Sequence, residues 1–370
     1  MNRTPRLPLL QSAQRALENC GYCPKLCRST CPVSNVEARE ALIPWAKMSS
    51  AWLAARGDLT ADRDLALTSW GCSGCHRCSN FCEHKNPVAD TLYAARAEYR
   101  DAGLAPDAVR ASEERHGKRG AEASAALSEL AKESGVRADA PVALLVGCAY
   151  LRKARSEARA MVRSVVALLG PVRLVSGCCG APSLHAGDRA GFEEARTRIE
   201  EQTRNAQPFV VGDPGCALAL SADRGSQAAA AVLSVPFVRL AADHAGKLRK
   251  IPGFGANSPV RFHDPCALGR GLGEYDAPRV VLARALGRKP DEFAEQRELS
   301  ECSGGGALLP IAMPETSAKI ADSRLRAHER EGGGTLVTAC ASSLRRFRAQ
   351  GTAAVDIASI VAQSLALPHE

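Results

Sequence analysis

The sequence predicts an α + α/β protein, in which a helical N-terminal region is followed by two repeated α/β domains with parallel sheets. Apolar residues at helical spacing dominate up to about residue 100, whereas short β-rich runs alternate with longer helical ones from residue 141 onward. Cysteine and glycine positions recur within the second half. Cysteine itself is unusually common, with 15 in 370 residues.

The composition excludes several classes of protein. Hydrophobic residues make up 45% and charged residues 24%, and no apolar run approaches the roughly 18 residues of a membrane-spanning helix. The formal charge of +8 is scattered and aromatic residues are only 4%, so we expect no nucleic-acid partner. Residues 1–11 lack the apolar core of a secretory signal. We therefore expect a cytoplasmic protein that reaches a membrane only peripherally, through a partner.

The cysteines are expected to be metal ligands or redox centres, since a reducing cytoplasm does not maintain disulfides and 370 residues can bury a core without them. Eight lie between Cys20 and Cys82, and seven lie between Cys148 and Cys340. Together with the change of pattern, this division predicts four segments: residues 1–100, a partly helical linker over 101–140, and two repeats over 141–252 and 253–370.

The N-terminal region is expected to be helical. Asn35 is a candidate cap for a helix over residues 36–42, and Pro44 either breaks this helix or starts a second helical segment. Further helices are predicted over residues 62–67 and 89–99.

From residue 141 onward, strands alternate with helices, which indicates parallel sheets covered by helices. The predicted strands cover residues 142–146, 172–175, 209–211, 260–262 and 335–337. Helices are predicted over residues 156–169 and 188–206 and from Ser342. The counterparts in the two halves are Cys148 and Cys266, 118 positions apart, and the pairs Cys178 with Cys302 and Cys216 with Cys340, each 124 apart. This register predicts an internal duplication.

Two N-terminal runs of four cysteines have the spacing of ligands to cubane iron–sulfur clusters. The second run, C-x2-C-x2-C-x3-C, matches the bacterial [4Fe–4S] pattern, and the first has one extra residue. Three thiolates in a tight loop cover three corners of an iron cube, and the last cysteine of paired runs usually crosses to the other cluster. We therefore predict two [4Fe–4S] clusters, one at Cys20, Cys23, Cys27 and Cys82 and the other at Cys72, Cys75, Cys78 and Cys31.

Structural zinc is the alternative for these cysteines, since zinc also uses C-x2-C pairs. Zinc sites are usually built from two separated pairs, however, and not from two compact quartets. Pro32 follows the first run and supports iron, whereas Glu83 follows the second run and departs from the pattern. His76 and His84 flank the second run and are not included among the ligands.

Most later cysteines follow a predicted strand, and ligands gather at the carboxyl ends of parallel strands. The motifs are Gly147-Cys148, Cys178-Cys179-Gly180, Asp213-Pro-Gly-Cys216, His263-Asp-Pro-Cys266, Cys302-Ser-Gly and Cys340. They resemble the cysteine-rich (CCG) domain family, which includes the catalytic subunits of heterodisulfide reductases and the iron–sulfur subunits of glycolate, lactate and anaerobic glycerol-phosphate oxidation. The N-terminal quartets, set apart by helices, resemble the α-helical ferredoxin domain of respiratory iron–sulfur subunits.

In that family a complete repeat has five cysteines, which hold a non-cubane [4Fe–4S] cluster in heterodisulfide reductases. This chain keeps Cys148, Cys178, Cys179 and Cys216 in its first repeat and Cys266, Cys302 and Cys340 in its second. Ala219 takes the last ligand position of the first repeat, and Ser303 and Ser343 replace thiols in the second. The resemblance therefore implies a third, non-cubane cluster in the first repeat. The second repeat is expected to be incomplete, since serine is a poor ligand for iron.

Alternatives remain for several of these residues. Cys178 and Cys179 are also consistent with a vicinal redox pair or with small buried residues. His263 and Asp264 are candidates either to complete the second site or to hydrogen-bond the turn before a proline. The glycine-rich runs of the second repeat lack the strand–helix context of a dinucleotide loop, so no flavin or nicotinamide site is expected.

These features predict an electron-transfer subunit of a multi-subunit oxidoreductase, since clusters carry single electrons over distances that side chains do not. The resemblance implies a flavoprotein dehydrogenase or a ferredoxin as redox partner, and a thiol/disulfide couple or a quinone as acceptor. One alternative is a disulfide reductase that is itself catalytic at the C-terminal cysteines. Another is a zinc-holding scaffold.

Overall fold

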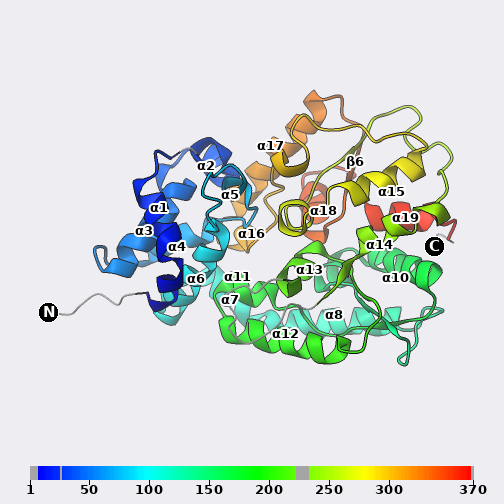
Figure 1. Ribbon diagram of the computed structural model, residues 1–370, viewed down its shortest axis with the longest axis horizontal. Coiled ribbons are helices and arrows are strands. Elements are labelled where there is room, and N and C mark those ends of the chain that lie inside the picture. The colour runs from blue at the N-terminus through cyan, green and yellow to red at the C-terminus, as the bar shows by residue number, and fades with distance from the viewer. Residues whose placement is uncertain (1–6, 26, 222–232, 368–370) are drawn as a thin grey trace. The chain divides into compact units, whose positions relative to one another are not determined.

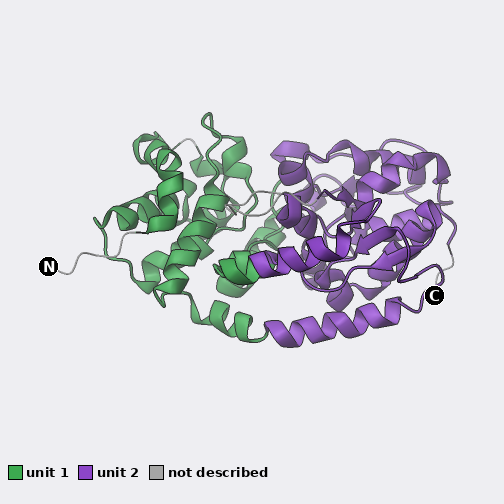
Figure 2. Ribbon diagram, turned by 60° about the horizontal axis from the view of Figure 1, so that its bottom comes forward, with its two compact units in different colours: residues 1–115, 182–192, 301–324 green, residues 116–181, 193–300, 325–370 purple. Residues whose placement is uncertain are grey.

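The computed structural model describes residues 7–25, 27–221 and 233–367, and Figure 1 shows the order of their helices and strands. Residues 1–6, which belong to the N-terminal segment considered above as a possible secretory signal, lie outside these ranges. The chain divides into two compact units, coloured separately in Figure 2. Unit 1 combines residues 1–115, 182–192 and 301–324, and unit 2 combines residues 116–181, 193–300 and 325–370.

Among its described residues, unit 1 contains helices and no strands. Its core gathers buried residues of three helices, Met48, Trp70 and Leu92. Asp62 caps one helix by accepting a hydrogen bond from the Leu65 N–H at 2.8 Å. The helices are η1 (Pro8–Ala13), α1 (Gln14–Tyr22), η2 (Arg28–Thr30), α2 (Pro32–Glu37), η3 (Glu40–Leu42), α3 (Pro44–Arg56), α4 (Arg63–Trp70), α5 (Arg77–Asn80), α6 (Val88–Asp101), α7 (Asp107–Glu114), α11 (Ala181–Ala186) and α16 (Leu309–Ala312). Helices α12 (Arg189–Thr203) and α17 (Pro314–Arg330) begin in unit 1 and continue in unit 2.

The predicted helix over residues 36–42 is wrong. Helix α2 starts earlier, at Pro32, and Ala38 ends it in the left-handed region at φ 50°. Proline favours the first position of a helix, because its φ is already helical and its missing N–H is not needed there. Asn35 therefore lies inside the helix, and its side chain donates to the Ser29 carbonyl at 2.9 Å. The other helices predicted in this region are present as α3, α4 and α6.

Unit 2 contains two parallel sheets, which confirms the predicted fold class. The first has the strand order β2-β1-β3-β4 and the second the order β5-β6-β7. The strands are β1 (Val142–Leu145), β2 (Val172–Leu174), β3 (Phe209–Val211), β4 (Val235–Pro236), β5 (Val260–Phe262), β6 (Thr335–Thr338) and β7 (Val355–Asp356). The helices are α8 (His116–Leu130), α9 (Cys148–Lys153), α10 (Arg155–Leu169), α13 (Pro214–Ser221), α14 (Phe237–Asp243), η4 (Ala245–Lys247), η5 (Ala267–Gly271), α15 (Asp276–Leu286), η6 (Arg297–Leu299), α18 (Ala341–Ala349) and α19 (Ile357–Ser364).

The two sheets follow one plan and share one core. The order β5-β6-β7 repeats β1-β3-β4, and a helix directly follows the last strand of each sheet, α14 after β4 and α19 after β7. Leu144 of the first sheet and Phe262 of the second belong to the same buried cluster. The Tyr150 hydroxyl donates to the buried Asp356 carboxylate at 2.7 Å and so joins the first repeat to the second. No described helix has both the length and the apolar composition to cross a bilayer.

Residues 101–140 are more helical than the sequence indicates. They contain α7, which belongs to unit 1, and α8, which belongs to unit 2 and buries Ala123 and Leu130. The buried face of α8 consists largely of alanine, which gives a weak apolar pattern. Two segments inside the predicted repeats, residues 182–192 and 301–324, belong to unit 1. The predicted domain boundaries stay a prediction.

Candidate metal centres

The second thiol group lines a cavity in unit 1. We use this name for Cys31, Cys72, Cys75 and Cys78. The first of these residues caps α2, the next two lie in the loop after α4, and the last lies in α5. Gly74 turns the loop at φ 65°, and a Cβ at this position would meet the Tyr93 hydroxyl oxygen at 2.1 Å. The turn that brings these thiols together therefore requires glycine.

The thiols of this group influence one another. Burial raises the pKa of Cys78 well above its usual value, the neighbouring Cys75, Cys72 and Cys31 raise it further, and the Lys47 ammonium opposes them. The Cys31 thiol, which comes from the first cysteine run, therefore faces the second run. Buried thiolates that repel one another suit a cationic iron core, which takes the place of their protons.

The first thiol group consists of Cys20, Cys23, Cys27 and Cys82. Burial raises the pKa of Cys20 to about 11, the Asn86 amide lowers it, and the thiols of Cys27, Cys82 and Cys23 raise it. The Asn86 side chain donates to the Cys20 sulfur at 3.2 Å. The structure thus brings the last cysteine of the second run to the first run. That each thiol group holds a [4Fe–4S] cluster stays a prediction.

A cubane cluster and a single metal ion require different arrangements of ligands. In the described ranges, no group of three or more His, Cys, Asp or Glu side chains is arranged to hold one metal ion. A single zinc ion needs its ligand atoms within about 2.3 Å. A cubane cluster is larger, and its thiolates bind separate iron corners. The membership of both thiol groups is consistent with this second requirement, because one set of four cysteines lines a single cavity and the other three thiols of the first group all act on Cys20.

The repeat-1 thiol group lies in unit 2, where the strands of the first sheet end. It consists of Cys148 at the start of α9 after β1, Cys178 and Cys179 after β2, and Cys216 in α13 after β3. Gly147, at φ 100°, precedes the first of these cysteines, and a Cβ there would lie 2.8 Å from the Asp213 Cβ. Glycine is therefore needed for the backbone to pass this close to the thiols.

Hydrogen bonds connect the repeat-1 thiols in a row, from Cys148 to Cys178, from Cys178 to Cys179 and from Cys179 to Cys216. The hydrogen bond to Cys178 raises the pKa of Cys148 well above its usual value, and burial and the Asp213 carboxylate add to this. For Cys216, the bond to Cys179 lowers the pKa, but burial and Asp213 raise it to about 12. The raised pKa values disfavour free thiolates at this group. Its four cysteines are therefore expected either to stay protonated or to bind a cation as thiolates.

The structure brings together two of the three second-repeat cysteines. Burial raises the pKa of Cys340, and the Asp213 carboxylate and the Cys266 thiol raise it further. Cys302 belongs to unit 1, where its sulfur lies 3.6 Å from the Ser73 hydroxyl oxygen and accepts the Gly304 N–H at 3.2 Å. Metal binding by these three cysteines stays a prediction.

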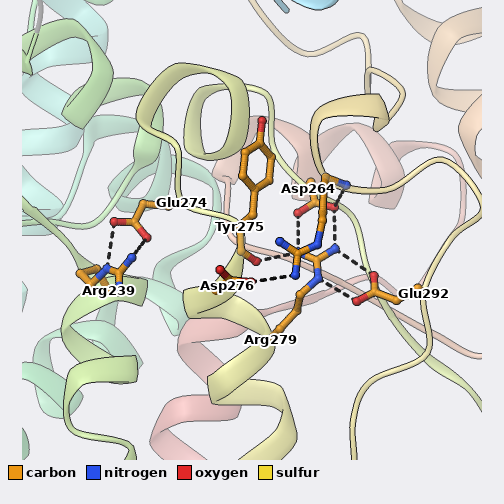
Figure 3. Close-up of polar contacts among 8 residues, drawn as sticks. Arg239, Asp264, Glu274, Tyr275, Asp276, Arg279 and Glu292 are labelled. Carbon is orange, nitrogen blue, oxygen red and sulfur yellow. Dashed lines mark hydrogen bonds and ion pairs between the residues drawn. The ribbon is translucent and has the colours of Figure 1, made fainter. Parts of the chain in front are cut away.

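Asp264 belongs to a buried ion-pair network in the second repeat, which Figure 3 shows. The Arg279 guanidinium donates to both Asp264 oxygens at 2.8 and 3.0 Å and also pairs with Glu292 at 2.7 Å. The Arg297 N–H donates to Asp264 at 2.9 Å. The carboxylate therefore holds the turn before Cys266. The neighbouring imidazole of His263 packs edge-on against Phe347, with 4.9 Å between the ring centroids.

Sequence analysis named Asp213 only as part of the motif that ends at Cys216, and it did not identify three other residues that influence the thiols, namely Lys47, Asn86 and Arg96. The sequence carries a signal for two of them, Lys47 and Arg96, which stand within apolar stretches of predicted helices. Lys47 interrupts the apolar run of α3 between Ala46 and Met48, and such a position is expected to be buried. Arg96 likewise lies between Ala95 and Ala97 in α6. Asn86 follows a run of polar residues, so its burial follows only from the fold.

Comparison with known families matches both parts of the chain. Residues 16–86 match the 4Fe-4S dicluster domain, and residues 142–221 and 260–345 each match the cysteine-rich domain, CCG. The two cysteine-rich matches confirm the predicted duplication. Together the matches span well over half of the chain.

Several curated proteins are similar to parts of this chain. A dihydromethanophenazine:CoB–CoM heterodisulfide reductase subunit of Methanosarcina barkeri is 28% identical over 207 residues, 51% of this chain and 50% of that protein. A probable membrane-anchored ferredoxin of Chromohalobacter salexigens is 35% identical over 32% of this chain and 18% of its own length. A fumarate reductase (CoM/CoB) subunit of Methanothermobacter marburgensis is 24% identical over 44% of this chain and 32% of its own length. The chain thus spans half or less of the length of these relatives. With its dicluster domain and two CCG domains, it belongs to the CCG-domain family of iron–sulfur proteins.

Proposed function

We propose that the chain is an electron-transfer subunit of a multi-subunit oxidoreductase, resembling heterodisulfide reductases and glycolate or lactate oxidases. The pair of four-thiol groups in unit 1, each with buried and partly buried cysteines, carries this proposal, since iron–sulfur clusters accept and donate single electrons. Two relatives are named as reductase subunits, which supports a role beside redox partners. The partner is a flavoprotein dehydrogenase or a ferredoxin, and the acceptor is a thiol/disulfide couple or a quinone. Contact with a membrane, if required, is peripheral.

Metal analysis of protein purified without oxygen tests this function. We expect about eight iron and eight acid-labile sulfide atoms per chain from two clusters, and about twelve of each if the first repeat also binds one. The reduced protein should show [4Fe–4S] signals in electron paramagnetic resonance (EPR) spectra. Zinc without iron or sulfide would identify a scaffold instead, and colourless, EPR-silent protein would contradict the proposal.

The repeat-1 thiol group supports a second candidate, a disulfide reductase that is catalytic at this group. Its row of hydrogen-bonded thiols favours this function, because adjacent thiols can pass a proton along the row and undergo thiol–disulfide exchange without a large movement. We expect Cys179→Ser to abolish disulfide reduction by reduced protein and to preserve the EPR signals of unit 1. Cys266→Ser is the control, since it removes a thiol from the second repeat. Unchanged turnover in Cys179→Ser would rule this candidate out.

A further inference from the structure

Lys47 is a buried cation beside the second thiol group. Its side chain projects from α3, is 1% exposed and lines the cavity together with Cys72 and Cys75. The ammonium nitrogen lies 3.6 Å from the Cys31 sulfur. In the part of the chain that the structure describes, no carboxylate forms an ion pair with it. A buried ammonium requires a negative partner, and here that partner is the thiolate group.

Arg96 places a second buried positive charge at the same group. It comes from α6, is fully buried, and its guanidinium donates to the Cys72 carbonyl at 2.9 Å. The other acceptors of this guanidinium are also main-chain carbonyls, so they leave its charge unneutralised. Burial raises the pKa of Cys72, and Lys47 and then Arg96 lower it. Both charges therefore act on this thiol group.

The surroundings of the first thiol group are different. Apart from burial, the groups that most change the pKa of Cys20 are the neutral Asn86 amide and three other thiols. Burial raises the pKa of Cys27, the main-chain N–H of Trp45 lowers it, and the neighbouring thiols raise it. Lys25 lies in this region but places its ammonium over the Trp45 ring, 4.1 Å from the centroid. Each group thus offers four cysteine thiols as ligands, but buried positive charges act only on the thiols of the second group in these comparisons.

A positive charge near an iron–sulfur cluster stabilises its reduced state, which carries one more negative charge, and burial strengthens this interaction. We propose that Lys47, assisted by Arg96, raises the reduction potential at the second thiol group above that at the first. An electron donated to unit 1 by a flavoprotein or ferredoxin then collects at the second group. This inference rests on the proposed function, since it requires a cluster at each group.

Redox titration of the intact anaerobic protein, followed by EPR, tests the inference. We expect Lys47→Met to raise the oxidised-to-reduced ratio of the second group about tenfold at a fixed potential, a fall of about 59 mV for a one-electron couple. The first group should keep its potential. Lys47→Arg should restore most of the wild-type value, because it retains the charge. Arg56→Met is the matched control, since Arg56 lies on the same helix, is exposed and pairs with Asp58.

Different results would contradict the proposed function and the role of Lys47. Wild-type protein without [4Fe–4S] signals would contradict the proposed function itself. Two signals whose potentials do not change in Lys47→Met, or change equally in Arg56→Met, would overturn only the role of Lys47. Lys47→Gln keeps a donor without the charge, and it replaces Lys47→Met if that variant fails to load iron. If both neutral variants lose the cluster and Lys47→Arg keeps it, Lys47 acts in assembly and the proposal is wrong.

Discussion

Cys82→Ser should remove the cluster of the first thiol group and leave the second intact, and Cys31→Ser should do the opposite. The reason is the exchange of thiols between the two cysteine runs. Cys82 faces Cys20 and Cys27, whereas Cys31 lines the cavity of the second group. Serine is a poor ligand for iron, so each variant should lose about four iron atoms per chain. Iron and sulfide analysis measures the loss, and EPR identifies which signal disappears.

Cys302→Ser is the control for this pair. It makes the same change at a buried thiol of unit 1, beside Ser73, that belongs to neither thiol group. We expect it to keep the iron of both groups. The crossed arrangement would be wrong if each variant lost the signal of its own cysteine run, or if both variants lost the same signal.

The helices and strands that the sequence predicts correctly are those with a strong local signal. Strands β1, β3 and β5 consist of consecutive buried residues, and α4 begins at a capping aspartate. The prediction of a helix over residues 36–42 was wrong, because Pro32 at the first helical position is a stronger start signal than Asn35 as a cap. Helix α8 was underestimated, because alanine supplies little apolar contrast along the chain.

The spacing of the cysteines in the sequence predicts which of them form each thiol group, but it does not predict which charged residues lie around that group. Ligands three or four residues apart must share one loop, so the two cysteine runs are visible in the sequence. Lys47 lies sixteen residues from Cys31, and only the packing of α3 brings the two together. The placement of Cys302 in unit 1 is likewise a tertiary effect, since the duplication aligns it with Cys178. Sequence reasoning therefore predicts the ligand type better than the charge around the ligands.

Arg96→Met should strongly destabilise unit 1. The guanidinium donates to the carbonyls of Ser69 and Cys72, at 2.8 and 2.9 Å, and to those of His185 and Ala307, at 2.9 and 3.0 Å. These acceptors belong to the three chain segments that form the unit, so one buried side chain connects all of them. Methionine would leave these carbonyls without this donor, and we expect a loss of roughly 3–5 kcal/mol in the free energy of unfolding.

Tryptophan fluorescence during denaturation measures this loss in unit 1 alone, because the only tryptophans, Trp45, Trp52 and Trp70, all lie there. Arg100→Met is the matched control on the same helix. Arg100 is 36% exposed in its side chain and pairs with Glu113 at 2.9 Å, so its removal should cost less than about 1 kcal/mol. Equal stability of the two variants would show that the segments of unit 1 hold together without Arg96. A large difference would show that this unit depends on one internal arginine for its assembly from three distant parts of the chain.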